Sequence, residues 1–480
     1  MIPTGVPTTR LRDLNGGSIH PEGEFVLYWM IANRRSCWNF SLDRALDYAR
    51  ALAKPLLVLE ALRLDYKWAS QRLHQFVIDG MRANQAAFAD SPITYFPYLE
   101  TRSGEGSGLL EWLAERAAVV VTDDFPCFFL PRMLTAAARR IQPKLEAVDS
   151  NGLFPMRATD RTFARAVDFR RYLQKHLERH LDHFPQASPL ARLELKRLSS
   201  LPQGRWRPSD LSQLRLEDLP VPALPGPVRF QGGSAAATEL LDHFLHQRLA
   251  GYDERNDPER KATSGFSPYL HFGHLSSHQV FHEVAERAGW RRARLGPQAR
   301  GQRTGWWGLE LATESFLDQL VTWRELGYNM CATQPAYDRW ESLPQWASAS
   351  LEEHADDPRD HVYSLDRFEQ ANTHDPLWNA VQNQLRQEGV IHNYLRMLWG
   401  KKVLHWTRHP REALEILIEL NNKYALDGRN PNSYSGIFWI FGRYDRAWGP
   451  ERPIFGKIRY MTSDSTRRKF NLEQYLARYS

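Results

Sequence analysis

The segment EFVLYWM, residues 24–30, decides the fold of the first third of the chain. It is short and rich in apolar, aromatic and β-branched side chains, which is typical of a buried strand. Three further segments share this character: LLVLE (56–60), ITYFPY (93–98) and AAVVVTD (117–123). Helical patterns separate them at 40–53, 70–88 and 108–115. This alternation predicts an α/β domain with a parallel, Rossmann-like sheet and helices on both faces.

A ligand of this domain is expected beyond the carboxyl ends of the strands, where parallel sheets form a crevice. No GxGxxG follows the first strand, so the fingerprint of dinucleotide-binding sheets is missing. The domain therefore has an expected binding place but no motif that identifies a ligand.

The second half of the chain has a different periodicity. Residues 185–235 are rich in Pro, Gly and Ser, as expected of a linker lying over the surface. Beyond them, apolar residues recur at helical spacing in six segments: 237–252, 276–290, 313–329, 375–389, 392–406 and 410–428. We therefore expect an α/β domain over 1–184, a linker over 185–235 and an all-helical domain over 236–480.

Composition excludes several classes of protein. Hydrophobic residues make up 42% and charged residues 25% of the 480, which argues against disorder. The three cysteines are far apart and form no CxxC pair, so we expect neither a disulfide scaffold nor a metal site. No apolar run is long enough for a membrane helix or a secretory leader, and a cytoplasmic location without a membrane partner is expected. The net charge of +6 does not by itself identify a nucleic-acid partner.

Tryptophan is the unusual residue, because eleven of the 16 lie between Trp290 and Trp448. In LDQLVTWRELGYN (317–329), Gln319 and Trp323 share a helical face, with Arg324 beside them. An amide and an indole on one face could hold a flat polar ring by hydrogen bonding and stacking. The alternative is a helix with Trp323 packed in the core.

The segment HNYLRMLWGKKVLHW (392–406) places Asn393, Arg396 and Trp399 along one stripe. Trp406 follows Trp399 by seven residues, which is two turns or about 10 Å of helical rise. This step suits electron hopping between indoles, and simple packing of two tryptophans is the alternative.

The segment KATSGFSPYLHFG (261–273) places Thr263, Ser264, Gly265 and Ser267 before or at the expected start of a helix. Hydroxyls and free backbone amides at such a point suit a phosphate group. An ordinary capped loop is the alternative.

The segment at 420–461 is dense in Asn, Gly, Asp, Arg and aromatic residues, and we expect an ordered loop system there rather than a simple helix. Arg443, Arg446 and Arg459 are interleaved with aromatic residues, a pattern that suits nucleic acid. The alternative is a solvated basic surface.

Together these motifs resemble the photolyase/cryptochrome family, and specifically the class II cyclobutane pyrimidine dimer photolyases, over nearly the whole chain. The most specific matches are YDERNDPERKATSGFSPYLHFG, LDQLVTWREL, HNYLRMLWGKKVLHWT and YALDGRNPNSYSGIFWIFGRYDR. The resemblance implies an α/β antenna domain, a long linker and a helical domain that binds FAD in a bent form. One ligand would then account for all four motifs.

The resemblance also implies roles for individual residues. Those expected to hold FAD are Tyr252, Thr263, Ser264, Gly265, Phe266, Ser267, Arg324, Asn393, and the ion pair of Arg396 with Asp427. Asn421 would lie at flavin N5. Those expected at a dimer flipped out of UV-damaged double-stranded DNA are Trp323, Met397 and Trp439, with Arg443, Arg446 and Arg459 on the DNA. Trp399, Trp378 and Trp406, in that order outward, would carry electrons for photoreduction of FAD.

One position departs from class II, because Gln319 stands where that class has a glutamate. An amide still donates hydrogen bonds but does not titrate. A cryptochrome-like photoreceptor with little or no repair is therefore the alternative to a repair lyase. A flavin enzyme without photochemistry, or a DNA-binding protein without the cofactor, is a third hypothesis. A deazaflavin-type antenna and a monomeric state are further expectations from the family.

Overall fold

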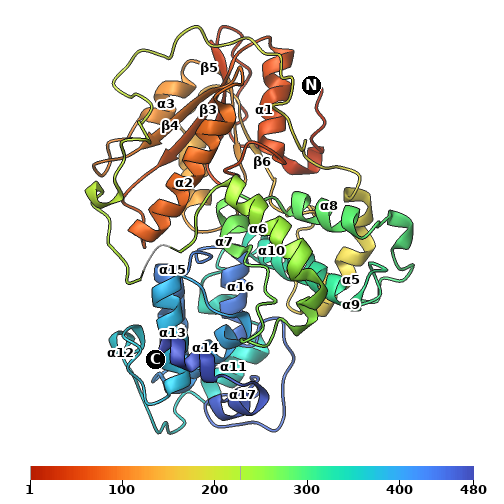
Figure 1. The fold of residues 1–480 in the computed structure, drawn as a ribbon, viewed down its shortest axis with the longest axis vertical. Coiled ribbons are helices and arrows are strands. Elements are labelled where there is room, and N and C mark those ends of the chain that lie inside the picture. The colour runs from red at the N-terminus through yellow and green to blue at the C-terminus, as the bar shows by residue number, and fades with distance from the viewer. Residues whose placement is uncertain (1, 227–228) are drawn as a thin grey trace.

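The computed structural model describes residues 2–226 and 229–480, and it divides into an α/β part and a helical part (Figure 1). The α/β part, red to orange, lies at one end of the long axis, and helices coloured green to blue occupy the rest. This confirms the predicted fold class. Residues 227–228, inside the predicted linker, lie outside the described residues. Among the described residues, no helix has the length and apolar character needed to cross a membrane.

Six strands form one sheet in the order β1-β6-β5-β2-β3-β4. They are β1 (Leu11–Asp13), β2 (Phe25–Met30), β3 (Leu56–Leu62), β4 (Thr94–Leu99), β5 (Ala117–Asp123) and β6 (Leu145–Val148). β1 is antiparallel to β6, and the other neighbouring strands are parallel. The four predicted strands are confirmed. β1 and β6 were not predicted, because strands of only three or four residues are too short to show an alternation of apolar and polar side chains.

Three helices of the α/β part follow the predicted pattern, and a fourth was not predicted. The three are α1 (Phe40–Ala51), α2 (Gln71–Phe88) and α3 (Leu109–Ala114), and the fourth is α4 (Leu130–Ala138). Asn39 caps α1 by accepting from the amides of Ser41 and Leu42, and Ser70 caps α2. Every residue of β2 and β5 is buried, as expected of strands covered on both faces.

The stretch between the two parts is irregular, with η3 (Leu216–Asp218) as the regular element among its described residues. It lies over the α/β part, where Trp206 packs on Trp112 with ring centroids 5.4 Å apart. Helix α5 (Ala166–His176) precedes this stretch, yet its Phe169 is buried in the core of the helical part. The range predicted for the first domain, 1–184, thus includes a helix that packs on the second.

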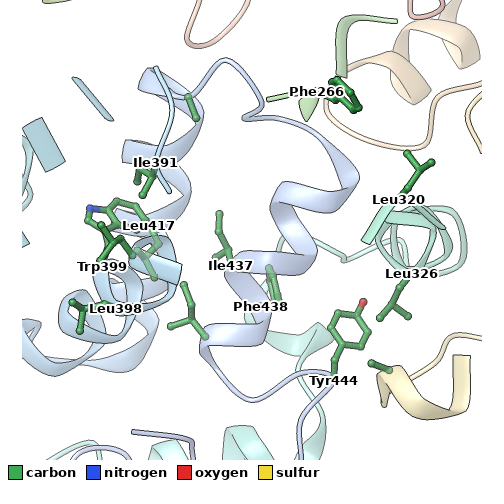
Figure 2. Close-up of a cluster of buried hydrophobic side chains, with 14 of the residues drawn as sticks. Phe266, Leu320, Leu326, Ile391, Leu398, Trp399, Leu417, Ile437, Phe438 and Tyr444 are labelled. Atoms are coloured by element: carbon green, nitrogen blue, oxygen red, sulfur yellow. The ribbon is translucent and has the colours of Figure 1, made fainter. Parts of the chain in front are cut away.

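The helical part is organised around α16, which packs on α10, α14 and α15. Figure 2 shows Ile437 and Phe438 of α16 between Leu320 on one side and Trp399 on the other. The elements are α6 (Ser234–Gln247), η4 (Leu249–Glu254), α7 (Ser267–Phe272), α8 (Ser277–Arg287), α9 (Leu311–Leu317), η6 (Asp318–Trp323), α10 (Arg324–Thr333), α11 (Gln345–Glu353), α12 (Leu365–Glu369), α13 (Pro376–Glu388), α14 (Asn393–Trp406), α15 (Pro410–Tyr424), α16 (Pro431–Ile440), α17 (Ser463–Lys469) and α18 (Glu473–Tyr479).

Helix α16 corrects the prediction of an ordered loop system over 420–461. Its start has standard helix chemistry, because the Asn430 side chain accepts from the Asn432 amide and Pro431 occupies the first turn. The serine, glycine and aromatic residues that follow have poor helix propensity, and burial against three helices overrides it. The chain is irregular at 425–430, between α15 and α16, and again after Ile440 up to α17.

Candidate active site

The continuous helix of α9, η6 and α10 is buried almost all round. Between Ala312 and Cys331, only Ser315, Gln319 and Trp323 are more than marginally accessible, and they are spaced four residues apart. Residues 318–323 form a π-helical turn, a feature frequent at functional sites. The structure therefore brings Gln319 and Trp323 to one accessible stripe.

Helix α16 presents a second stripe of this kind. Its accessible residues are Asn432, Gly436 and Trp439. The ring centroids of Trp439 and Trp323 are 5.5 Å apart, with 43° between the ring planes. Because neither indole is fully buried, the pair offers an aromatic surface on which a flat group can stack. Gln319, one turn from Trp323, adds an amide donor and acceptor beside it.

Helix α14 contributes a charged group. Asn393, Arg396 and Met397 in its first turns are accessible, whereas every residue from 398 to 404 is buried. Nη2 of Arg396 lies 3.0 and 3.2 Å from the two carboxylate oxygens of Asp427, which follows α15. The two side chains are 20% and 14% exposed, so the pair is largely withdrawn from solvent but reachable.

Asn421 of α15 is buried and held in a fixed orientation. Its Nδ2 donates to Oγ of Ser433 on α16 at 2.7 Å and to Oδ1 of Asn422 at 3.3 Å. Since the nitrogen is engaged by protein acceptors, the amide oxygen is the atom available to a ligand.

The hydroxyl-rich segment lies where α7 begins. Thr263 and Ser264 are partly accessible, Gly265 has a left-handed backbone with φ +75°, and Ser267 is exposed in the first turn. A Cβ added to Gly265 would meet only Leu240, at 3.5 Å, so space remains above the backbone. Tyr252 of η4 is buried edge-on against Phe316, with centroids 5.2 Å apart, and burial raises the pKa of its phenol to about 12.

Three buried indoles connect α13 and α14. Trp378, Trp399 and Trp406 are exposed by 0%, 1% and 3%. Nε1 of Trp378 donates to the carbonyl oxygen of Trp399 at 3.0 Å, and the rings of Trp378 and Trp406 are 6.2 Å apart. The three side chains predicted as an electron path are thus neighbours inside the protein.

Two predicted arginines point elsewhere. Arg324 donates from Nη1 to the Asn151 carbonyl at 2.7 Å and from Nη2 to the Tyr328 hydroxyl at 3.1 Å, and it is buried. Arg443 is 3% exposed and donates to the Ser342 carbonyl. Both guanidinium groups are buried and donate to protein acceptors, and the predicted cofactor contact of Arg324 and DNA contact of Arg443 remain predictions.

Arg446 and Arg459 remain on the surface, and both stack on one exposed indole. Their guanidinium carbons lie 4.8 and 5.4 Å from the ring centre of Trp448, which is 36% exposed. Two cations that flank an aromatic ring on an irregular loop form a surface suited to a phosphate backbone and unstacked bases.

A cavity of about 430 Å³ lies in the α/β part, beyond the carboxyl ends of its parallel strands. Ile31, Arg63, Glu100 and Phe125, which follow β2, β3, β4 and β5, all line it. Arg429 of the helical part also contributes to its wall. The place agrees with the crevice expected from the sheet, although no sequence motif indicated its size.

Comparison with known proteins identifies the family. The chain is 35% identical over 471 residues to a deoxyribodipyrimidine photo-lyase from Methanothermobacter thermautotrophicus, covering 98% of this chain and 97% of the relative. It is 34% identical over 486 residues to the rice protein of the same name, covering 98% and 90%. The chain belongs to the photolyase–cryptochrome family.

The fold comparison agrees with this family membership. A class III photolyase from Agrobacterium tumefaciens superposes with a TM-score of 0.68 at 18% identity, covering 97% of this chain and 87% of that one. A Synechocystis cryptochrome superposes with a TM-score of 0.65 at 15% identity. No family model matches the chain. Because the photo-lyase relatives align over almost its whole length, this member of the photolyase–cryptochrome family is an enzyme of the photo-lyase type.

Members of the photolyase–cryptochrome family bind FAD, and the donor set of this chain fits that cofactor. The accessible hydroxyls of Thr263, Ser264 and Ser267 at the start of α7 match the needs of a diphosphate. The Arg396–Asp427 pair and the oriented amide of Asn421 supply a donor, a carboxylate and an acceptor for a polar ring system.

One residue near the site lies within the segment 392–406 but was not predicted as a site residue. Lys401 is buried on α14, and its Nζ donates to the Ile440 carbonyl at the end of α16, one residue after Trp439. Burial lowers the pKa of this lysine to about 7. A cation at a helix C-terminus is favourable, so Lys401 helps to hold the end of α16.

Proposed function

We propose that the chain repairs UV-damaged DNA by splitting cyclobutane pyrimidine dimers in a light-driven reaction that depends on FAD, in the manner of class II photolyases. The observation that carries this proposal is the accessible pair of Trp323 and Trp439, with Gln319 beside it, on helices that are otherwise buried. A signalling protein has no need of an accessible aromatic surface of this kind.

FAD would be held by residues from four elements. Tyr252 and the hydroxyls of Thr263, Ser264 and Ser267, with the amides of Gly265 and Phe266, would bind its phosphates. Arg396 and Asp427, with Asn393 at the rim, would bind beside its ring system. The fixed orientation of Asn421 supports a role for its amide oxygen at flavin N5. When bound and reduced, the flavin supplies the photoexcited electron that opens the cyclobutane ring.

The lesion would stack on Trp323 and Trp439, with Met397 along one edge. Flipping a damaged pair out of the duplex costs less than flipping an intact one, because its stacking and pairing are already poor. Gln319 would donate its amide hydrogens to the carbonyl oxygens of the dimer. It orients the lesion but, unlike a carboxylic acid, transfers no proton.

Electrons for reduction of FAD would pass inward from Trp406 through Trp378 to Trp399. Their contact inside the protein supports this route. DNA would be held near the pocket by Arg446 and Arg459 around Trp448, since their cations face solvent.

The cavity beyond the sheet would bind a light-harvesting chromophore. Its walls are mainly apolar and aromatic. The arginines on them are engaged by the protein: Arg34 pairs with Glu60, Arg63 pairs with Asp65, and Arg429 donates to backbone carbonyls. A flat aromatic molecule such as a deazaflavin suits such walls.

Gln319 is the observation that favours the second candidate, a cryptochrome-like photoreceptor. The two functions are separated by incubating the photoreduced holoprotein with a thymine-dimer oligonucleotide in blue light and in darkness. Light-dependent recovery of intact thymines supports repair. Normal photoreduction of FAD without recovery supports the photoreceptor and contradicts the proposed repair.

A further inference from the structure

The outer tryptophan of the proposed path touches two side chains that no family motif includes. The ring of Tyr363 stands edge-on to Trp406 at 5.9 Å and 87°, and the ring of His374 lies 4.8 Å from the same indole. The Tyr363 amide also donates to the Trp406 carbonyl at 2.9 Å. Tyr363 and His374 lie in the loops that flank α12 (Figure 1), so backbone and side chains hold the three rings together.

Two hydrogen bonds join the Tyr363 hydroxyl to His374. Its Oη lies 2.7 Å from Nδ1 of His374 and also 3.1 Å from the backbone nitrogen of His374. The backbone N–H can only donate, so it occupies a lone pair of the phenol oxygen. The phenol oxygen keeps a second lone pair, so the direction of its contact with Nδ1 follows the tautomer of His374. In the tautomer that carries its hydrogen on Nε2, Nδ1 is the acceptor and the phenolic hydrogen points at it. The pair is set to move a proton from phenol to imidazole.

A proton that reaches His374 can pass on to solvent. Tyr363 is 8% exposed, whereas His374 is exposed, and the exposed ring of His361 stacks on it with centroids 3.7 Å apart. Desolvation, followed by the neighbouring His361, lowers the pKa of His374 below its ordinary value, so the imidazole is neutral and able to accept at neutral pH.

A nearby cation favours passing the hole onward from Trp406. Nζ of Lys402, a buried side chain, lies 4.9 Å from the centre of the Trp406 ring. A positive charge at this distance raises the energy of a radical cation on the indole. A tyrosyl radical that has lost its proton is neutral and carries no such penalty.

We propose that Tyr363 is the terminal electron donor of the tryptophan path and that His374 is its proton acceptor. This rests on the proposed function, in which photoexcited oxidised FAD is the oxidant and the hole reaches Trp406. Tyr363 then gives one electron to the oxidised Trp406 and its phenolic proton to Nδ1 of His374. The products are neutral Trp406, a neutral tyrosyl radical and an imidazolium that releases a proton to solvent. A soluble thiol later returns one hydrogen atom to Tyr363.

The test is flash excitation of the holoprotein with oxidised FAD, followed by transient absorption and by electron paramagnetic resonance of freeze-trapped samples. We expect a tryptophan radical that decays into a tyrosyl radical. Tyr363→Phe keeps the ring and loses the tyrosyl signal, and His374→Phe keeps the aromatic stack and loses it as well. Tyr460→Phe is the matched control, because the Tyr460 ring packs on Phe455 instead, and it keeps the signal.

Acidification provides a second readout. Protonating His374 blocks the proton transfer, so the tyrosyl yield falls as the pH drops through the pKa of His374. The basic neighbours that influence this pKa are His361, Lys402 and His405, and the acidic neighbour is Asp375. A tryptophan radical without a tyrosyl radical in the wild type, or a tyrosyl signal that survives Tyr363→Phe, overturns the inference. Absence of any tryptophan radical refutes the electron path itself, and the inference with it.

Discussion

Replacing Trp399 by phenylalanine removes the inner indole of the proposed electron path and keeps an apolar ring in the core. Trp399 is 1% exposed, and its Nε1 donates to Oε1 of Gln382 at 2.9 Å. Gln382 is itself fully buried. Phenylalanine cannot donate, so the glutamine oxygen loses this partner. A buried acceptor left unsatisfied costs about 1–3 kcal/mol, and the free energy of unfolding falls by that amount before any cavity is counted.

The double variant Trp399→Phe/Gln382→Leu separates stability from electron transfer. Leucine at 382 removes the acceptor that Trp399→Phe leaves unsatisfied, but it also removes the Nε2 donor to the Glu369 carbonyl at 3.3 Å. Because this second bond is longer, we expect the double variant to regain part of the lost stability. Its electron path stays interrupted. The two variants therefore differ in stability but share the same defect in photoreduction.

The assay combines urea unfolding with blue-light reduction of bound FAD, followed by the flavin absorbance. We expect both variants to retain FAD and to lose photoreduction. Photoreduction at the wild-type rate in either variant would refute the assigned path. Loss of FAD from the double variant would show that Trp399 is needed for binding.

Three other predictions test the site. Gln319→Glu raises the repair yield if the site is otherwise of the class II type. It also makes the yield depend on pH, because the new carboxylic acid titrates. An unchanged yield would show that the site is built around the amide. Trp323→Ala weakens binding of dimer-containing DNA by about 5- to 150-fold in a dark titration, since base–aromatic stacking contributes about 1–3 kcal/mol, whereas Trp206→Ala on the α/β part leaves it unchanged. Asp427→Asn leaves Arg396 without its charged partner and lowers the free energy of unfolding of the holoprotein by about 1.5–3 kcal/mol. Equal stability of the variant and the wild type in a urea titration would show that the ion pair is dispensable.

Much of the fold follows from local pattern. Apolar runs such as residues 117–123 have the length and composition of buried strands, and β5 begins and ends where they do. Helices α13, α14 and α15 likewise follow their apolar periodicity. Helix α16 does not, because three neighbouring helices stabilise residues whose own propensity is poor, and a single sequence carries no information on those contacts.

The candidate site was predictable in its residue types but not in their orientation. The spacing of Gln319 and Trp323 indicates a common face, yet the exposure of that face is a tertiary property. Arg443 and Arg446 look equivalent in a basic, aromatic segment, and only packing separates the buried one from the exposed one. The Tyr363–His374 pair joins two short loops across α12, a closeness that neither periodicity nor composition reveals.

The most direct test of the proposed repair is the loss of dimers after single flashes given to the photoreduced holoprotein bound to a thymine-dimer oligonucleotide. The wild type and the Trp323→Ala/Trp439→Ala variant are compared at saturating DNA. We predict that dimers disappear with each flash in the wild type and persist in the variant, while both keep their FAD. Dimers that persist in the wild type, or disappear equally in both proteins, would contradict repair in this pocket.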